Sequence, residues 1–238
     1  IWSFSEKSSL VLSSNSRPLE TISIKLKDSF NTNWLPSSAK WSIEIINAIT
    51  KKSYKNNSSI LSGARILVSP SEKLEFEIFQ LSQWGGSNKK LTPSKLYAIT
   101  FGNTNEGNNA NINKLAGLGF SYSVPLHENN FRLYGQLAGE DEAGNLPSCY
   151  GYISGIELSI PKIKYPTITT IELVDTRVPR STNGNCGPNT MYNNSIYKYI
   201  NYTSVLGAPI DSEAISLEVF GKTEINKNLS VNYSTKRH

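Results

Sequence analysis

Three adjacent carboxylates, Glu140, Asp141 and Glu142, form a concentrated acidic run. Paired carboxylates can hydrolyse glycosidic bonds by acid–base chemistry, and clustered carboxylates can ligate calcium. Successive residues of a strand point to opposite faces, so these three side chains cannot easily converge on one bond. The same rule places Glu172 and Asp175 on opposite faces of one strand. We therefore expect the acidic run to form a solvated loop rim or an internal hydrogen-bond network.

Other catalytic and metal-binding patterns are missing from the sequence. There is no Gly-x-Ser-x-Gly motif, and neither His127 nor His238 has an evident serine or cysteine partner by motif. Cys149 and Cys186 lack the spacing of redox or metal sites. In an oxidising compartment they can form a disulfide, and the sequence leaves that pairing open. We predict a protein without catalytic activity, metal or cofactor.

The segment 177–211 is the better candidate for ligand recognition. It combines four tyrosines and many asparagines with Arg177, Arg180 and Lys198. Tyrosine rings can stack on sugar faces, amides can bond hydroxyls, and cations attract acidic sugars. The alternative is an ordered loop that folds over the mouth of the protein, with tyrosines that simply pack. The candidate ligand-binding residues are Glu140, Asp141, Glu142, Asp175, Arg177, Tyr192, Asn194, Tyr197 and Tyr199.

Strands with a period of two must position these groups. One strand has an apolar face opposite a polar face, formed respectively by Phe131, Leu133, Gly135 and Leu137 and by Arg132, Tyr134, Gln136 and Glu140. The segment 115–126 alternates most cleanly and is long enough to cross a bilayer. Further strands are predicted at 22–26, 41–45, 73–78, 150–160, 167–176, 213–221 and 228–235. The acidic run, followed by Gly144 and Pro147, predicts the end of its strand in a loop.

The predicted connections alternate in length, as they do in outer-membrane barrels. Short connections are expected at 69–72, 127–130, 161–166 and 222–228, and longer ones at 83–112, 141–148 and 177–211. The stretch 96–101 looks like a strand, but the alternation places it inside the connection 83–112 as a hairpin or helix. This alternation favours a membrane barrel over a soluble β-sandwich, and tryptophans near strand ends and in loops support it.

The composition bounds the class of protein. The 238 residues are 38% hydrophobic with a mean hydropathy of -0.34, and no apolar run approaches the roughly twenty residues of a membrane helix. The net charge of +5 comes from scattered cations, which do not indicate a nucleic-acid site. The sequence starts without an initiator Met or signal peptide. We expect a single β-barrel domain over 1–238 from a longer protein, without its signal peptide.

Several short motifs follow one another along nearly the whole chain. They are Gly63-Ala64-Arg65, Gln83-Trp84-Gly85-Gly86, Tyr134-Gly135-Gln136, Gly139-Glu140-Asp141-Glu142, Leu146-Pro147-Ser148, Gly155-Ile156-Glu157, Asp175-Thr176, Tyr192-Asn193-Asn194 and Leu206-Gly207. Together, their order and spacing resemble the Wzi family of capsule assembly proteins. One departure is Asn194, which stands where the family run resembles histidine, so a role that needs an imidazole is not carried over.

The resemblance implies an all-β fold, a large antiparallel transmembrane β-barrel of the outer-membrane type with about eighteen strands. About eleven strands are expected here, which makes the chain a partial barrel. The resemblance also implies that the helical N-terminal portion of the family is missing from this chain. The resemblance also implies a non-enzymatic surface lectin of the bacterial outer membrane that binds capsular polysaccharide and assists capsule assembly. We further expect contact with outer-membrane lipid, no nucleic-acid partner and a monomer. The alternatives are a porin-like solute channel and a secreted β-sandwich adhesin.

Overall fold

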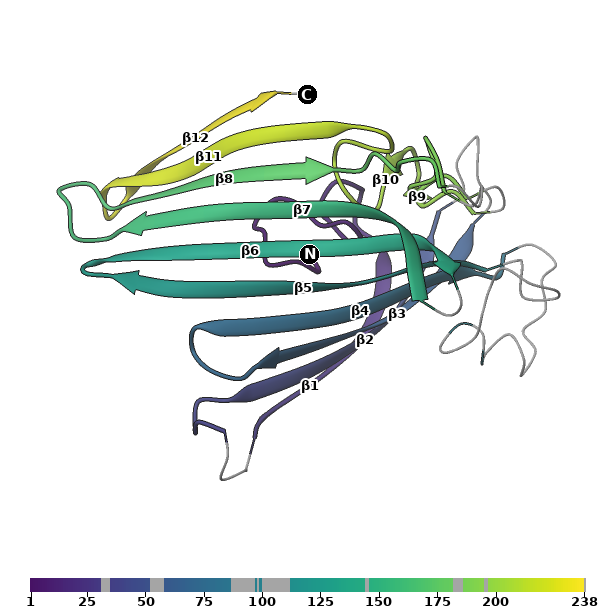
Figure 1. Ribbon diagram of the computed structural model, residues 1–238, viewed down its shortest axis with the longest axis horizontal. Helices are drawn as coiled ribbons and strands as arrows, with labels where there is room; N and C mark the ends of the chain where they lie inside the picture. Colours follow the sequence, from purple (N-terminus) through teal and green to yellow (C-terminus); the bar gives the residue numbers. More distant parts are fainter. Residues whose placement is uncertain are drawn as a thin grey trace.

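Ten antiparallel strands form one sheet, in which each strand pairs with the next along the chain except that β8 pairs with β11 (Figure 1). The computed structural model describes residues 1–30, 35–51, 58–86, 97, 99, 112–143, 146–181, 186–194 and 197–237, with the side chains of 141–143 and 146–147 left out. The strands of the sheet are β1 (Glu20–Ser29), β2 (Lys40–Thr50), β3 (Ser59–Ser69), β4 (Leu74–Trp84), β5 (Asn113–Leu126), β6 (Asn129–Ala143), β7 (Leu146–Ile160), β8 (Thr167–Asp175), β11 (Ile215–Asn226) and β12 (Leu229–Arg237). A separate short hairpin consists of β9 (Ile200–Asn201) and β10 (Ser204–Val205).

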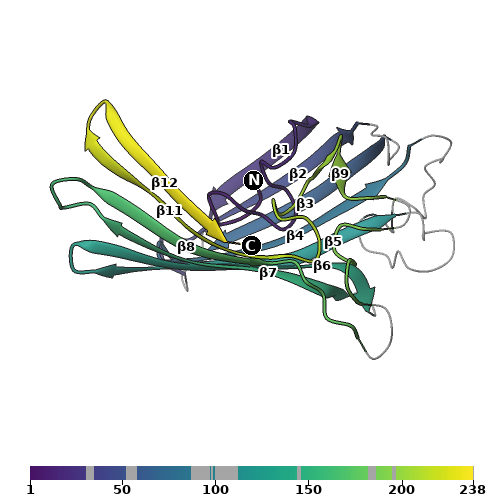
Figure 2. The same cartoon turned by 90° about the horizontal axis from the view of Figure 1, so that it is seen from above.

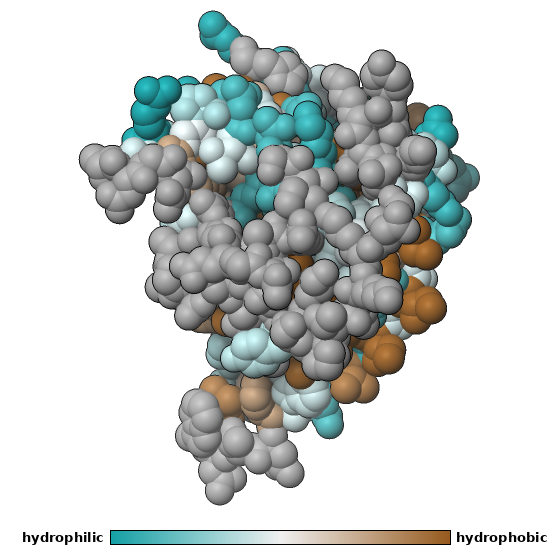
Figure 3. Space-filling view, turned by 90° about the vertical axis from the view of Figure 1, so that its right-hand side faces the viewer, coloured by the Kyte–Doolittle hydropathy of each residue, from teal (hydrophilic) through white to brown (hydrophobic). Residues whose placement is uncertain are grey.

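The sheet is curved, and its two faces differ in chemistry (Figure 2). Alternate side chains point to opposite faces because a strand has a period of two. The convex face carries exposed large apolar side chains, among them Ile24, Leu118, Leu133, Ile156, Ile171 and Leu217. Figure 3 shows hydrophobic residues gathered along one side of the molecule. In the described part of the chain no second sheet covers this face, which contradicts the β-sandwich alternative.

The two ends of the strands carry different connections. At one end, here called the turn end, the strands are joined by residues 30–39, 70–73, 127–128, 161–166 and 227–228. At the other end, here called the cap end, they are joined by 51–58, 85–112, 144–145 and 176–214. The strands predicted at 150–160, 167–176, 213–221 and 228–235 are confirmed as β7, β8, β11 and β12.

Some predicted boundaries are wrong. The sequence predicts a loop at 141–148, but β6 continues to Ala143 and β7 begins at Leu146, with these two residues paired. Pairing with the neighbouring strand therefore overrides the local turn signal of Pro147, which pairs with Glu142. In the same way, the expected connection 222–228 contracts to 227–228 because β11 continues to Asn226.

The predicted element at 96–101 lies mostly outside the described residues. Tyr97 and Ile99 are described, and both have helical backbone. Ile99 is buried with Ile112 against Trp84, and its carbonyl oxygen accepts a hydrogen bond from the Ser82 hydroxyl at 2.8 Å. Within the described residues, no helix has the length and apolar character needed to cross a membrane.

Residues 1–19, here called the plug, lie on the concave side of the sheet without helix or strand structure (Figure 2). Trp2, Leu10 and Val11 of the plug are buried in the main hydrophobic core. Their core partners come from the sheet and from residues 176–214, and include Leu61, Leu81, Leu115, Tyr134, Met191 and Leu206. The core therefore lies between one sheet and two irregular segments.

A disulfide joins Cys149 of β7 to Cys186, with an S–S distance of 2.02 Å. The sequence left this pairing open, and the fold brings the two cysteines together across 37 residues. The bond ties the long segment 176–214, here called the cap, to the ten-stranded sheet, here called the wall.

Gly155 of β7 leaves room for the ring of Tyr134 on β6. The two residues are paired in the sheet, and a Cβ at Gly155 would lie 2.1 Å from Cζ of Tyr134. Tyr134 is almost fully buried, and its hydroxyl donates to Oε2 of Glu172 at 2.6 Å. The missing side chain at position 155 therefore sets the position of the ring.

We predict that Gly155→Ala lowers the free energy of unfolding by about 1–3 kcal/mol, because the added Cβ forces Tyr134 away from Glu172. Gly187→Ala is the matched control, since a Cβ at Gly187 meets nothing within 4 Å. Thermal unfolding of both variants in detergent, followed by circular dichroism, measures the difference. Equal unfolding midpoints would contradict the prediction.

Candidate functional site

Charged side chains on the concave face pair with one another across neighbouring strands. Nη2 of Arg65 on β3 lies 2.6 Å from Oε2 of Glu77 on β4. Nη2 of Arg132 on β6 lies 2.6 Å from Oε2 of Glu157 on β7, and Nε of Arg132 donates to Oε1 at 3.2 Å. Each arginine therefore has a carboxylate partner within the wall of the sheet.

Gln136 of β6 binds the main chain of the plug through both ends of its amide. Its Oε1 accepts the N–H of Leu10 at 2.7 Å. Its Nε2 donates to the carbonyl oxygen of Trp2 at 2.7 Å and to Oε1 of Glu77 at 2.9 Å. Nη1 of Arg132 adds a hydrogen bond to a further plug carbonyl at 3.0 Å. Side chains of the wall thus supply the hydrogen-bond partners that the irregular backbone of the plug cannot find within itself.

The cap directs three of its four tyrosines inward. The side chains of Tyr192, Tyr197 and Tyr199 are buried, each 3% exposed or less. The hydroxyls of Tyr192 and Tyr199 donate to the carbonyl oxygens of Leu10 and Val11 at 2.7 and 2.8 Å. Burial raises the pKa of Tyr199 well above its ordinary value. The enclosed rings favour the packing role that the sequence left as an alternative to stacking on sugars.

Glu140 joins the wall to the cap. Its buried carboxylate accepts the N–H of Tyr192 through Oε2. Within the cap, Oδ1 of Asn194 accepts the N–H of Tyr197 at 3.1 Å. Glu140 therefore belongs to an internal hydrogen-bond network, one of the two roles expected for the acidic run. Asp141 and Glu142 lie in the strand, and their side chains are outside the described part of the structure.

Glu172 and Asp175 lie on opposite faces of β8, as the strand period predicts. Glu172 faces the concave side and accepts the hydroxyl of Tyr134. Asp175 binds Arg177, with Oδ1 accepting from Nε at 2.9 Å and Oδ2 accepting from Nη2 at 2.7 Å. Hydrogen bonding to Asp175 raises the pKa of the Arg177 guanidinium. The structure therefore does not bring these two carboxylates together as an acid–base pair.

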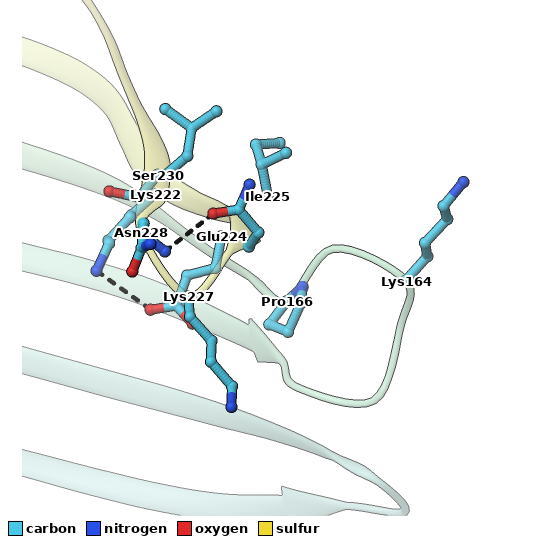
Figure 4. Close-up of a pocket in the computed structure, with 10 residues that line it drawn as sticks. Lys164, Pro166, Lys222, Glu224, Ile225, Lys227, Asn228 and Ser230 are labelled. Carbon is cyan, nitrogen blue, oxygen red and sulfur yellow. Dashed lines mark hydrogen bonds and ion pairs between the residues drawn. The ribbon is translucent and has the colours of Figure 1, made fainter.

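The turn end has a shallow cavity of about 400 Å³ beside the β11–β12 hairpin (Figure 4). Lys164, Lys222, Glu224 and Lys227 are among its lining residues, and Nζ of Lys222 lies 3.2 Å from Oε1 of Glu224. None of the ligand-binding residues predicted from the sequence lines this cavity. Among the described residues, no group of three or more His, Cys, Asp or Glu side chains is arranged to hold a metal ion.

An aromatic ring and a cation meet at the cap end, close to the start of β1. Tyr202, in the turn between β9 and β10, is half-buried, and its ring centroid lies 4.9 Å from Cζ of exposed Arg17. Tyr202 stands in the segment that the sequence singled out for recognition. The sequence did not single out Arg17, because no local pattern links it to Tyr202, which is distant in the chain.

The described features define a class of protein. One face of the sheet is apolar and uncovered, and the other carries buried charged and polar side chains beside the core and is filled, which is the construction of an outer-membrane β-barrel wall. Strands β1 and β12 remain as edges, so the ten strands form part of such a wall. The model of the family described as "Capsule assembly protein Wzi" matches residues 1–238, and the chain belongs to this family.

Two relatives agree with this assignment. The solved structure of Wzi from Escherichia coli, described as an outer-membrane, carbohydrate-binding β-barrel involved in group 1 capsule assembly, matches with a TM-score of 0.74 and 25% identity. That match covers 99% of this chain and 50% of the solved chain, so this chain spans about half the length of that relative. An uncharacterized 55.8 kDa protein from the cps region of Klebsiella pneumoniae is 35% identical over 97 residues, which are 40% of this chain and 19% of that protein.

We predict that Gln136→Ala loosens the plug, because it leaves the N–H of Leu10 and the carbonyl of Trp2 without their amide partner. The expected loss of stability is about 2–4 kcal/mol. Limited trypsin digestion should then cut faster after Lys7, whose Nζ otherwise lies 2.5 Å from Oε1 of Glu218.

Asn232→Ala is the control for this experiment, since it also removes an amide but at an exposed position of β12. If both variants resist trypsin as well as the unaltered protein does, Gln136 does not hold the plug.

Proposed function

We propose that this protein binds capsular polysaccharide at the outer surface of the outer membrane and assists capsule assembly without altering the polymer. The observation that carries the proposal is the match of the capsule assembly family to all of residues 1–238. The Escherichia coli relative, described as carbohydrate-binding, shares the fold of this chain at a TM-score of 0.74.

Because the concave face is filled, the structure supports binding of the polymer at the surface and not its transport through the lumen of the barrel. The plug is hydrogen-bonded to β6 through Gln136 and to the cap through Tyr192 and Tyr199. The buried side chains of plug, wall and cap belong to one core. A long polymer would therefore meet the protein at its cap end, where the connections are longest and polar side chains are exposed.

The partners of the carboxylates support binding without catalysis. Glu140 accepts a backbone N–H from the cap, Glu172 accepts the hydroxyl of Tyr134, and Asp175 is paired with Arg177. Two carboxylates that cleave a glycosidic bond must face each other across the sugar. The carboxylates of Glu172 and Asp175 instead point to opposite faces of the sheet.

We also propose that the convex face contacts outer-membrane lipid and that the protein is a monomer without a nucleic-acid partner. The exposed apolar side chains of that face, such as Leu118 and Ile156, support the lipid contact, because acyl chains accept such surface without cost.

Capsule retention tests the proposed function directly. Deleting the gene should move capsular polymer from the cell-bound fraction to the medium, and a plasmid copy should reverse this. Polymer in both fractions is measured by its acidic-sugar content after centrifugation. Unchanged retention in the deletion strain would refute the proposal.

A solute channel is the second candidate, because the polar concave face, with Arg65 and Arg132, is also typical of porins. We predict no steady conductance from the intact protein in planar bilayers, since plug and cap occupy that face. Deleting residues 1–14 should produce current by removing most of the plug. Steady ohmic current through the intact protein would favour the channel instead.

A further inference from the structure

Tyr202 has a backbone conformation that its side chain disfavours. It is the first of the two residues between β9 and β10, and its φ is 55°. Glycine is the usual residue at such a left-handed position of a two-residue turn, because a Cβ is strained there. Tyr192 also has a positive φ, of 64°, but its ring is buried, whereas the ring of Tyr202 is partly exposed at the cap end.

The surroundings hold Tyr202 in a defined place. The neighbouring Asn201 is 1% exposed, and its Nδ2 donates to the carbonyl oxygen of Arg17 at 3.0 Å. Its Oδ1 accepts the N–H of Lys51, at the end of β2, at 3.0 Å. One buried amide thus fixes the hairpin to both the plug and the wall. The ring centroid of Tyr202 and Cζ of Arg17 are therefore held 4.9 Å apart before a ligand binds.

Arg17 has charge available for a ligand. The other cation of this corner, Lys51, is paired with Glu20 at 2.5 Å. Among the described residues, no carboxylate forms an ion pair with Arg17, and its side chain is exposed. A guanidinium presents a planar set of donors that matches a carboxylate.

We propose that Arg17 and Tyr202 form a subsite for a carboxylate-bearing sugar of the bound polymer. The guanidinium of Arg17 binds the sugar carboxylate, and the exposed part of the Tyr202 ring contacts the apolar face of the sugar. This inference rests on the proposed polysaccharide binding and adds to it a class of sugar and two residues. It also explains a tyrosine where the turn favours glycine.

The decisive variant is Tyr202→Gly, because it removes the ring and relieves the backbone at the same time. Its unfolding midpoint should equal or exceed that of the unaltered protein. Its affinity for the polymer should nevertheless fall about five- to tenfold. A residue kept only for the fold would show no such loss of binding in a variant with unchanged stability.

Arg17→Gln tests the class of sugar. The probes are the capsular polysaccharide of the strain that carries the gene and its carboxyl-reduced, neutral derivative, each titrated onto the detergent-purified full-length protein. The variant should bind the acidic polymer about tenfold or more weakly and the reduced polymer almost normally. Tyr165→Ala and Lys162→Gln, at the turn end, remove the same kinds of group and should change neither affinity.

The outcomes separate this inference from the proposed function. If the unaltered protein binds neither probe, both fail. If it binds the acidic polymer and the Arg17 and Tyr202 variants bind equally well, the subsite is wrong and the function stands. A capsular polymer without carboxylate sugars that binds normally would also overturn the subsite.

Discussion

The irregular backbone of the plug determines what the wall around it must provide. A segment without helix or strand has N–H and C=O groups that need partners wherever water is excluded. Gln136 and Arg132 meet this need from the wall, and the hydroxyls of Tyr192 and Tyr199 meet it from the cap. The polar character of the concave face thus has a structural cause. The polar side chains of the concave face bind the backbone of the plug. The same alternation of side chains is also found where a strand lines a channel.

The elements of the sheet were predictable because each depends on a pattern within one strand. The alternation in 115–126 and 131–137 identified strands and the orientation of their faces, which the exposed Leu118 and Leu133 confirm. Boundaries that depend on a neighbour were not predictable. Pro147 indicates a turn locally, yet β7 already begins at Leu146, because it pairs with β6 up to Ala143.

The candidate site was predictable only in part, because burial is a property of the whole fold. The tyrosines of the cap were identified by composition, but composition does not distinguish a ring that faces sugar from one that faces the plug. Glu140 lies in an internal network, one of the two roles that the sequence left open for the acidic run, but the sequence did not indicate that its partner is the backbone of the cap. The plug and Arg17 gave no periodic or motif signal, so nothing before the structure connected them with the cap.

The plug also bears on how such a wall is assembled. In the chain it comes before β1, yet its partners Gln136, Tyr192 and Tyr199 are all synthesised later. These contacts join residues 126 to 188 positions apart in the chain, so forming them closes large loops at a cost in chain entropy. The backbone of the plug therefore has these hydrogen-bond partners only in a state in which β6 and the cap are already folded.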